Sequence, residues 1–266
     1  MGREDEIIER TIIDGITKEY SEVTSYRLIP SNFPYCSVLH YYYNKEAITK
    51  SSFLSEYYCQ VGKIGHFIIQ NVIANSDLKI VGTWECCNCH YTDNKILTHP
   101  ELCIKCGGKE FVYKEINVSY NNFDFRIYGR VDGLLYDNKY DKFTLLEFKF
   151  ITQLPVKVLE SHKNQILSYC IMLMKYDIEI KSVYVIYLDI SNPTKIQIFK
   201  INNSDNNLII MQKRLDTWIT QYKMIKSDKV SEDYVFLNNY RNLCNNTNFC
   251  VESQCQFCKI CDQKGV

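Results

Sequence analysis

The hydrophobic pattern is most regular in the middle of the chain, between residues 128 and 150. Two stretches there alternate apolar positions with polar or small ones, and this period of two predicts β-strands. The polar run 137–142 separates them and predicts a turn, so the whole stretch predicts a β-hairpin. The alternating residues are Val131, Gly133 and Leu135 against Arg130, Asp132 and Leu134 in the first strand, and Leu146, Phe148 and Phe150 against Glu147 and Lys149 in the second.

Antiparallel pairing about the middle of this turn places residues opposite each other when their numbers sum to 279. Asp132 and Glu147 then face each other with Cβ atoms roughly 4.5–5.5 Å apart, and Lys149 shares their face. Adjacent carboxylates repel each other, and a divalent cation such as Mg²⁺ or Mn²⁺ between them removes that cost. An ordinary surface hairpin with a Glu–Lys pair also fits the pattern.

The rest of the chain predicts further helices and strands. A long helix is expected at 50–76, where Gly62, Gly65 and His66 interrupt the apolar face. A glycine costs about 1 kcal/mol relative to alanine in a helix, so close packing or function should explain the pair. His66 taken alone also fits a buried core histidine. The other expected elements are helices at 3–19, 155–176 and 205–226 and strands at 109–120, 123–136, 181–189 and 194–201.

Charge and hydropathy narrow the class of protein. Lysine plus arginine and aspartate plus glutamate both number 31, so contact with nucleic acid requires a local basic groove rather than an overall positive field. The chain has no apolar run long enough to span a membrane, and its charged start lacks the apolar core of a signal peptide. We therefore expect a cytoplasmic protein without a membrane partner.

Four cysteines form two CxxC pairs, Cys86 with Cys89 and Cys103 with Cys106, and 13 residues separate the pairs. Two such knuckles can hold four thiolates around one ion, and the spacing is that of a zinc ribbon. We predict a structural Zn²⁺ that contributes folding energy. The neighbouring Cys87, His90 and His99 are not expected to be ligands.

A second group of cysteines lies in the C-terminal tail, which has no hydrophobic period. Thirteen cysteines in an intracellular chain do not indicate a disulfide framework, so we expect the tail cysteines to be metal ligands. A second zinc site is one interpretation of them. Cys36 stands alone near the start of the chain and on its own fits a core residue. The tail cysteines are Cys244, Cys250, Cys255, Cys258 and Cys261.

Taken in order, the motifs resemble the PD-(D/E)XK nuclease superfamily, in the RecB-like branch that includes iron–sulfur exonucleases of CRISPR adaptation and of recombination helicase–nucleases. Val131 stands where the superfamily has proline. The matching motifs are Gly62-x3-His66 for the helical histidine, Gly129-Arg130-Val131-Asp132-Gly133 for the aspartate strand, Glu147-Phe148-Lys149 for the E-x-K strand and Gln165-x3-Tyr169 for the Q-x3-Y helix.

The resemblance extends to cysteines at both ends of the chain. Residues 31–43, with Cys36, are similar to the first-cysteine motif of the iron–sulfur members, whose other three ligands are C-terminal. The tail departs from the usual Cys-x2-Cys-x5-Cys pattern, although Cys255 and Cys261 keep the second spacing. The implied [4Fe–4S] ligands are Cys36, Cys250, Cys255 and Cys261, with Cys258 as the alternative.

The resemblance implies an α/β fold in which helices flank a mixed central sheet, as in the restriction-endonuclease core. The expected parts are an N-terminal helical part of the nuclease domain at 1–79, a zinc-ribbon insertion at 80–110, the nuclease core at 111–226 and an iron–sulfur lobe at 227–266.

The resemblance also implies chemical roles. Lys149 is expected to position the attacking water or to offset developing charge. Gln165 and Tyr169, one turn apart on one helix face, are expected to steady Lys149 or the DNA backbone. One or two Mg²⁺ or Mn²⁺ ions would activate water and polarise the scissile phosphate. The implied metal ligands are His66, Asp132, Glu147 and the carbonyl oxygen of Phe148.

The implied function is metal-dependent hydrolysis of DNA by an exonuclease acting on single-stranded or frayed ends. Its setting would be recombination, replication or CRISPR spacer acquisition, with a helicase or an integrase as partner. Two rival readings stay open. One is an endonuclease or flap nuclease that uses the same site, and the other is a non-catalytic nucleic-acid-binding zinc and iron–sulfur module of a larger complex.

Overall fold

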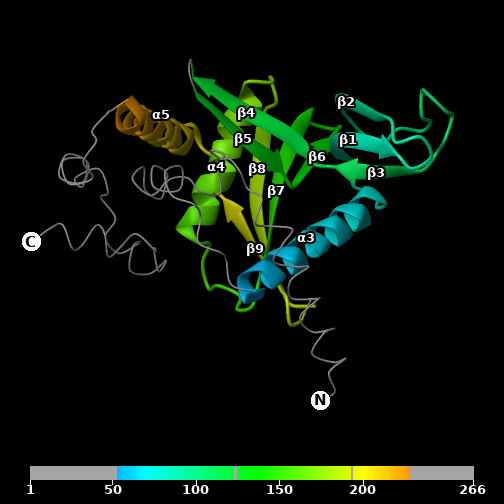
Figure 1. The fold of residues 1–266 in the computed structure, drawn as a ribbon, viewed down its shortest axis with the longest axis horizontal. Coiled ribbons are helices and arrows are strands. Elements are labelled where there is room, and N and C mark those ends of the chain that lie inside the picture. The colour runs from blue at the N-terminus through cyan, green and yellow to red at the C-terminus, as the bar shows by residue number, and fades with distance from the viewer. Residues whose placement is uncertain (1–52, 123–124, 193, 228–266) are drawn as a thin grey trace, which may run out of the picture.

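A computed structural model describes residues 53–122, 125–192 and 194–227 of the chain (Figure 1). The expected iron–sulfur ligands Cys36, Cys250, Cys255, Cys258 and Cys261 lie outside these residues, as does the helix predicted at 3–19. The helices are α3 (Phe53–Ala74), α4 (Glu160–Met174) and α5 (Asp205–Ser227). The strands are β1 (Ile80–Cys86), β2 (Thr92–Leu97), β3 (Phe111–Lys114), β4 (Ile116–Asn122), β5 (Phe125–Val131), β6 (Gly133–Asp137), β7 (Lys142–Ile151), β8 (Ile180–Asp189) and β9 (Ile196–Ile201).

The central sheet has seven strands, six of them in the order β2-β1-β6-β7-β8-β9, while β3 also pairs with β1. Strands β7 and β8 run parallel and the other pairs are antiparallel, so the sheet is mixed. Strand β1 links the centre of the sheet to the cysteine-containing region. Its start pairs with β6, where Ile80 lies opposite Leu135, and its end pairs with β2 and β3 in the cysteine-containing region.

Helices cover both faces of this sheet, which confirms the expected α/β class (Figure 1). Helix α4 connects the parallel strands β7 and β8, and it packs with α5 over the larger core, which includes Leu145, Val185 and Leu215. On the opposite face, Leu146 and Phe148 of β7 pack toward Ile69 of α3. The alternation in β7 therefore sends Leu146 and Phe148 toward α3, and Glu147 and Lys149 toward α4. None of the described helices combines the length and apolar character that a membrane span requires.

Two predicted strands are each broken in the structure. The strand expected at 109–120 is divided at Glu115 into β3 and β4, and the strand expected at 123–136 is divided at Asp132 into β5 and β6. The cause is packing, because β4 and β5 leave the central sheet to form a two-stranded sheet whose Ile116 and Val131 join the core beside α4. The chain must therefore bend at Glu115 and at Asp132, where these strands separate from the central sheet.

Helix α4 also begins later than predicted, at Glu160 rather than at Pro155. Residues 152–159 cross from the end of β7 in bends, and the first helical turn follows Leu159, whose N–H is held by the hydroxyl of Tyr187. Proline fixes only its own φ, so it does not by itself start a helix at this position.

Candidate active site and cysteine cluster

The β6–β7 hairpin has the predicted register, since Gly133 pairs with Leu146 and Asp137 pairs with Lys142. Asp132 lies one residue beyond this ladder, at the bend between β5 and β6. Its Oδ2 accepts a hydrogen bond of 2.8 Å from the backbone N–H of Phe148. The side chain of Asp132 thus takes the place of a strand partner for β7 at the point where the ladder ends.

A chain of polar contacts leads from β7 to α4. The ammonium of Lys149 lies 2.8 Å from Oε1 of Glu147 and donates to Oε1 of Gln165 at 2.9 Å. Nε2 of Gln165 in turn donates to the hydroxyl of Tyr169 at 3.2 Å. The structure therefore brings together the four residues of the E-x-K strand and the Q-x3-Y helix that the sequence singled out.

Glu147 is a buried carboxylate whose hydrogen bonding is incomplete. Its residue is 1% exposed, and its Oε2 has no hydrogen-bond partner among the described residues. Burial, followed by the charge of Asp132, raises the pKa of Glu147 to about 8, although Lys149 acts in the opposite direction. A buried oxygen of this kind costs free energy unless something binds it.

His66 reaches the site from α3. Its Nδ1 lies 3.4 Å from Oδ1 of Asp132, and its ring packs at 5.3 Å between centroids against Phe150. Gly65 allows this close approach, because a Cβ there would lie 2.3 Å from a ring carbon of Phe150. Burial disfavours the imidazolium, but the hydrogen bond and the charge of Asp132 outweigh it and raise the pKa of His66.

Glu115 joins this site, although it was not among the residues predicted from the sequence. Ligand atoms of His66, Glu115 and Asp132 all lie within 4.8 Å of one another. Gln70 of α3 holds the group together, because its Nε2 donates to Oε1 of Glu115 at 3.1 Å and to the backbone oxygen of Asp132 at 2.8 Å. The other oxygen of Glu115 lies 3.5 Å from Nε of Arg130.

The pairing of β4 with β5 explains why Glu115 lies here. Ile116 pairs with Val131, so Glu115 and Asp132 are the next residues on the two strands, and both stand at the bends. The predicted strands 109–120 and 123–136, paired about the turn between them, would have placed Glu115 opposite Tyr128, whereas the partners in the structure have numbers that sum to 247. No motif marked Glu115, and Gln70 carried no signal.

The donor set suits a hard divalent cation. Carboxylate oxygens with one imidazole are ligands that Mg²⁺ and Mn²⁺ accept, and two or more close carboxylates supply the compensating charge. The group of His66, Glu115 and Asp132 could hold a metal ion. Glu147 is not part of that group of three, although its charge interacts with those of Asp132 and His66, and its Oε2 has no hydrogen-bond partner among the described residues.

The four cysteines of the CxxC pairs also come together, with all sulfurs within 4.8 Å of one another. Sγ of Cys86 lies 3.5 Å from Sγ of Cys106, and Sγ of Cys89 lies 3.6 Å from Sγ of Cys103. These four thiols are free rather than disulfide-bonded. They form a second group that could hold a metal ion.

The two knuckles have the same backbone geometry. In each, the N–H of the residue after the second cysteine donates to the carbonyl of the first: His90 to Cys86 at 2.9 Å, and Gly107 to Cys103 at 2.8 Å. Both donors have positive φ, 55° for His90 and 71° for Gly107. Burial works against ionisation of Cys103, but hydrogen bonds from backbone N–H groups and from the neighbouring thiols outweigh it and lower its pKa to about 7.

The neighbouring histidines serve other purposes. Nδ1 of His90 lies 3.0 Å from a carboxylate oxygen of Glu85. The ring of His99 packs against those of Trp84 and Phe111, with centroid distances of 4.6 and 5.5 Å. Neither histidine belongs to the group of four thiols that could hold a metal.

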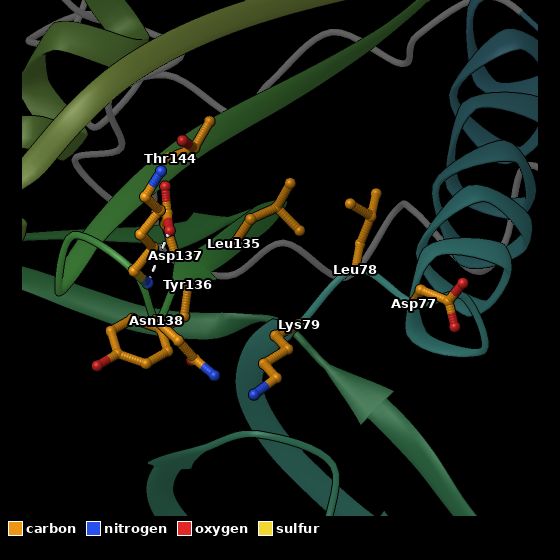
Figure 2. Close-up of a pocket in the computed structure, with 9 residues that line it drawn as sticks. Asp77, Leu78, Lys79, Leu135, Tyr136, Asp137, Asn138 and Thr144 are labelled. Carbon is orange, nitrogen blue, oxygen red and sulfur yellow. Dashed lines mark hydrogen bonds between the residues drawn. The ribbon is translucent and has the colours of Figure 1, made fainter.

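A cavity of about 420 Å³ lies away from both groups, beside the tip of the β6–β7 hairpin (Figure 2). It contains no residue of the Asp132 site and no cysteine. Its lining contains acidic, basic and apolar side chains. The lining residues are Asp77, Leu78, Lys79, Leu135, Tyr136, Asp137, Asn138, Lys139 and Thr144.

No protein-family model and no curated protein matches this chain. Solved structures that match this one in part include SSO0001, at 14% identity and a TM-score of 0.44, covering 80% of this chain and 86% of that one. Another is an alkaline exonuclease (LHK-Exo) from Laribacter hongkongensis, at 10% identity and a TM-score of 0.39, covering 78% of this chain and 93% of that one. Similarity this distant leaves function to be argued from the geometry of the site.

Proposed function

We propose that this protein is a metal-dependent deoxyribonuclease that hydrolyses phosphodiester bonds at single-stranded or frayed DNA ends. The observation that carries the proposal is the buried carboxyl group of Glu147, which lies beside Asp132 and is joined to Lys149, and whose Oε2 has no hydrogen-bond partner among the described residues. A surface hairpin would expose these charges to water. Here they are buried together, where perturbed carboxylates are typical of a catalytic centre.

A divalent cation bound here would polarise the scissile phosphate and lower the pKa of a water molecule. His66, Glu115, Asp132 and Glu147 are the side chains that would hold it, with the Phe148 carbonyl oxygen as a further ligand. The ammonium of Lys149 keeps its proton, because the charges of Glu147 and Asp132 outweigh burial and raise its pKa.

Lys149 would then hold the attacking water or stabilise negative charge on the phosphate. Gln165 fixes the direction of that ammonium through its 2.9 Å hydrogen bond, and Tyr169 fixes Gln165. Two acceptors on one ammonium leave its third N–H for the substrate.

We further propose that the cysteine cluster binds a structural Zn²⁺. Zinc–sulfur bonds of about 2.3 Å in a tetrahedron place the sulfurs about 3.8 Å apart. The two Sγ–Sγ separations of 3.5 and 3.6 Å are close to that value. We also propose, on the sequence motifs alone, a [4Fe–4S] cluster on Cys36, Cys250, Cys255 and Cys261. The division into four parts and a helicase or integrase partner are proposals on the same basis.

The proposal is tested by purifying the wild type and Lys149→Ala without oxygen and incubating each with end-labelled single-stranded DNA and Mn²⁺ or EDTA. We expect cleavage by the wild type only with Mn²⁺, and a loss of about 100-fold or more in Lys149→Ala. Lys142→Ala is the matched control, because it removes a half-buried lysine of the same strand that pairs with Glu179. Its activity should equal that of the wild type.

The substrate distinguishes the kinds of nuclease. A circular single strand should resist the wild type, since an exonuclease needs an end, and its cleavage would replace the exonuclease reading with an endonuclease. DNA binding without metal-dependent cleavage would overturn the enzymatic proposal in favour of a binding module.

A further inference from the structure

The first turn of helix α4 is capped by a side chain from the sheet rather than from its own sequence. Its N-cap, Leu159, makes no side-chain capping hydrogen bond. Instead the N–H of Leu159 donates to the hydroxyl of Tyr187 on β8 at 3.1 Å. The same hydroxyl lies 2.9 Å from Nδ1 of His162, in the first turn of the helix. One hydroxyl therefore holds the start of α4 at two points.

Tyr187 is placed rigidly beside the strand that carries Lys149. In the parallel ladder of β7 and β8, Lys149 and Tyr187 are register partners. Tyr187 is fully buried, and its ring packs edge-on against Phe199 at 5.7 Å between centroids. The position of its hydroxyl is thus set by the core, and the helix start takes its position from that hydroxyl.

The hydrogen bonds of the Tyr187 hydroxyl bear on the protonation state of His162. The Tyr187 hydroxyl accepts from the N–H of Leu159, and a His162 tautomer with its proton on Nε2 would let Nδ1 accept the proton of that hydroxyl. The imidazole then carries its own proton on Nε2 and is neutral. Burial, and then the positive charge of Lys149, lower the pKa of His162 to about 3, which agrees with this state.

We propose that Tyr187 is a positioning residue of the nuclease site, whose hydroxyl fixes α4 so that Gln165 meets Lys149. The inference rests on the proposed function. Gln165 follows His162 by three residues on the same helix face, and its contact with Lys149 is 2.9 Å long. A displacement of about 1 Å at such a contact can cost as much as 100-fold in rate.

The test is Tyr187→Phe, which removes the hydroxyl and keeps the ring. Tyr120→Phe is the matched control, because Tyr120 is also buried and its hydroxyl also joins a strand to a helix, through Asp216 and Gln212 of α5. We expect Tyr187→Phe to lower kcat about 10-fold at an unchanged KM for DNA. The control should keep kcat within about twofold while its melting temperature falls comparably.

A double variant separates positioning from general loss of stability. If Tyr187 acts through Gln165, then Gln165→Ala with Tyr187→Phe should have the same kcat as Gln165→Ala alone. His162→Leu, which removes the other partner of the Tyr187 hydroxyl, should also lower kcat. Additive losses in the double variant, or a wild-type kcat in Tyr187→Phe, would overturn the positioning role.

A crystal structure of Tyr187→Phe measures positioning without an activity assay. We expect the separation between Nζ of Lys149 and Oε1 of Gln165 to exceed 3.5 Å, the limit of a hydrogen bond. An unchanged separation would overturn the inference even in an active enzyme. A wild type that never cleaves DNA would instead overturn the proposed function, whatever this distance shows.

Discussion

The two candidate metal sites of this protein are built in opposite ways. The cysteine cluster uses four soft ligands from two short knuckles with the same turn. The group at Asp132 combines hard donor atoms from α3 and from the bends at Glu115 and Asp132, which are far apart in the sequence. Local spacing is enough to build the first site, whereas only the sheet topology assembles the second.

The burial of charge differs in the same way. The knuckles supply backbone N–H groups that help to ionise Cys103, so ligation and folding act together. Around Glu147, burial and a neighbouring carboxylate oppose ionisation, and one oxygen has no partner among the described residues. We infer that the cysteine cluster stabilises the fold, whereas the buried acidic groups of the Asp132 site lower the free energy of unfolding and are kept for catalysis.

The largest expected effect is on stability in Cys103→Ser. Loss of one buried thiolate from a four-thiolate zinc site should cost about 3 kcal/mol or more, because metal binding is coupled to folding. Thermal unfolding and zinc content are the measurements. Cys87→Ser, an exposed neighbour outside the cluster, is the control. Equal melting temperatures of the two variants would remove the assigned structural role.

Glu115→Gln should affect the other site alone. Glutamine still accepts a hydrogen bond from Gln70 but lacks the charge, so we expect Mn²⁺ affinity to fall about 10-fold with zinc content unchanged. Calorimetric titration with Mn²⁺ is the measurement, and Glu179→Gln, an exposed carboxylate paired with Lys142, is the control. Unaltered Mn²⁺ affinity would exclude Glu115 from the site.

The glycine pair of α3 separates packing from helix propensity. A Cβ at Gly65 would collide with Phe150, so Gly65→Ala should destabilise the protein by about 1–3 kcal/mol and displace His66. A Cβ at Gly62 meets nothing within 4 Å, so Gly62→Ala should stabilise by up to about 1 kcal/mol. Urea unfolding measures both. Changes of the same sign would contradict this account.

His162 predicts a smaller effect that depends on pH. The unfolded chain protonates this imidazole near pH 6.5, whereas the folded chain does so only near pH 3, because burial and Lys149 depress its pKa. Its contribution is therefore complete above pH 6.5 and is lost as the pH falls. Between pH 7 and 5 the unfolding free energy should fall about 1–2 kcal/mol further in the wild type than in His162→Asn. Parallel urea titrations at the two pH values would reveal equal losses if the prediction is wrong.

The sequence predicted those features that depend on local pattern. The hairpin register follows from a period of two and one turn, and the CxxC spacing identifies the four clustered thiols. The α/β class and the face shared by Glu147 and Lys149 follow from the same periodicity. The contact of Lys149 with Gln165 was anticipated only through the family resemblance.

The features that were missed depend on three-dimensional packing. The breaks at Glu115 and Asp132 arise because β4 and β5 turn away to cover α4, and no local residue preference encodes that bend. Gln70 joins the site only because α3 crosses the same bends. Likewise, the hydroxyl of Tyr187 on β8 holds the start of α4 at Leu159, a contact that no local pattern indicated.

The most direct test of the account is the behaviour of Glu147→Gln, with stability and Mn²⁺-dependent cleavage measured on the same preparation. Glutamine can still accept from Lys149 and, unlike the carboxyl group of Glu147, can never become charged beside Asp132. The account predicts an unfolding free energy that is unchanged or about 1 kcal/mol higher, with cleavage of end-labelled DNA reduced about 100-fold or more. A variant that unfolds, or one that cleaves DNA as the wild type does, would contradict it.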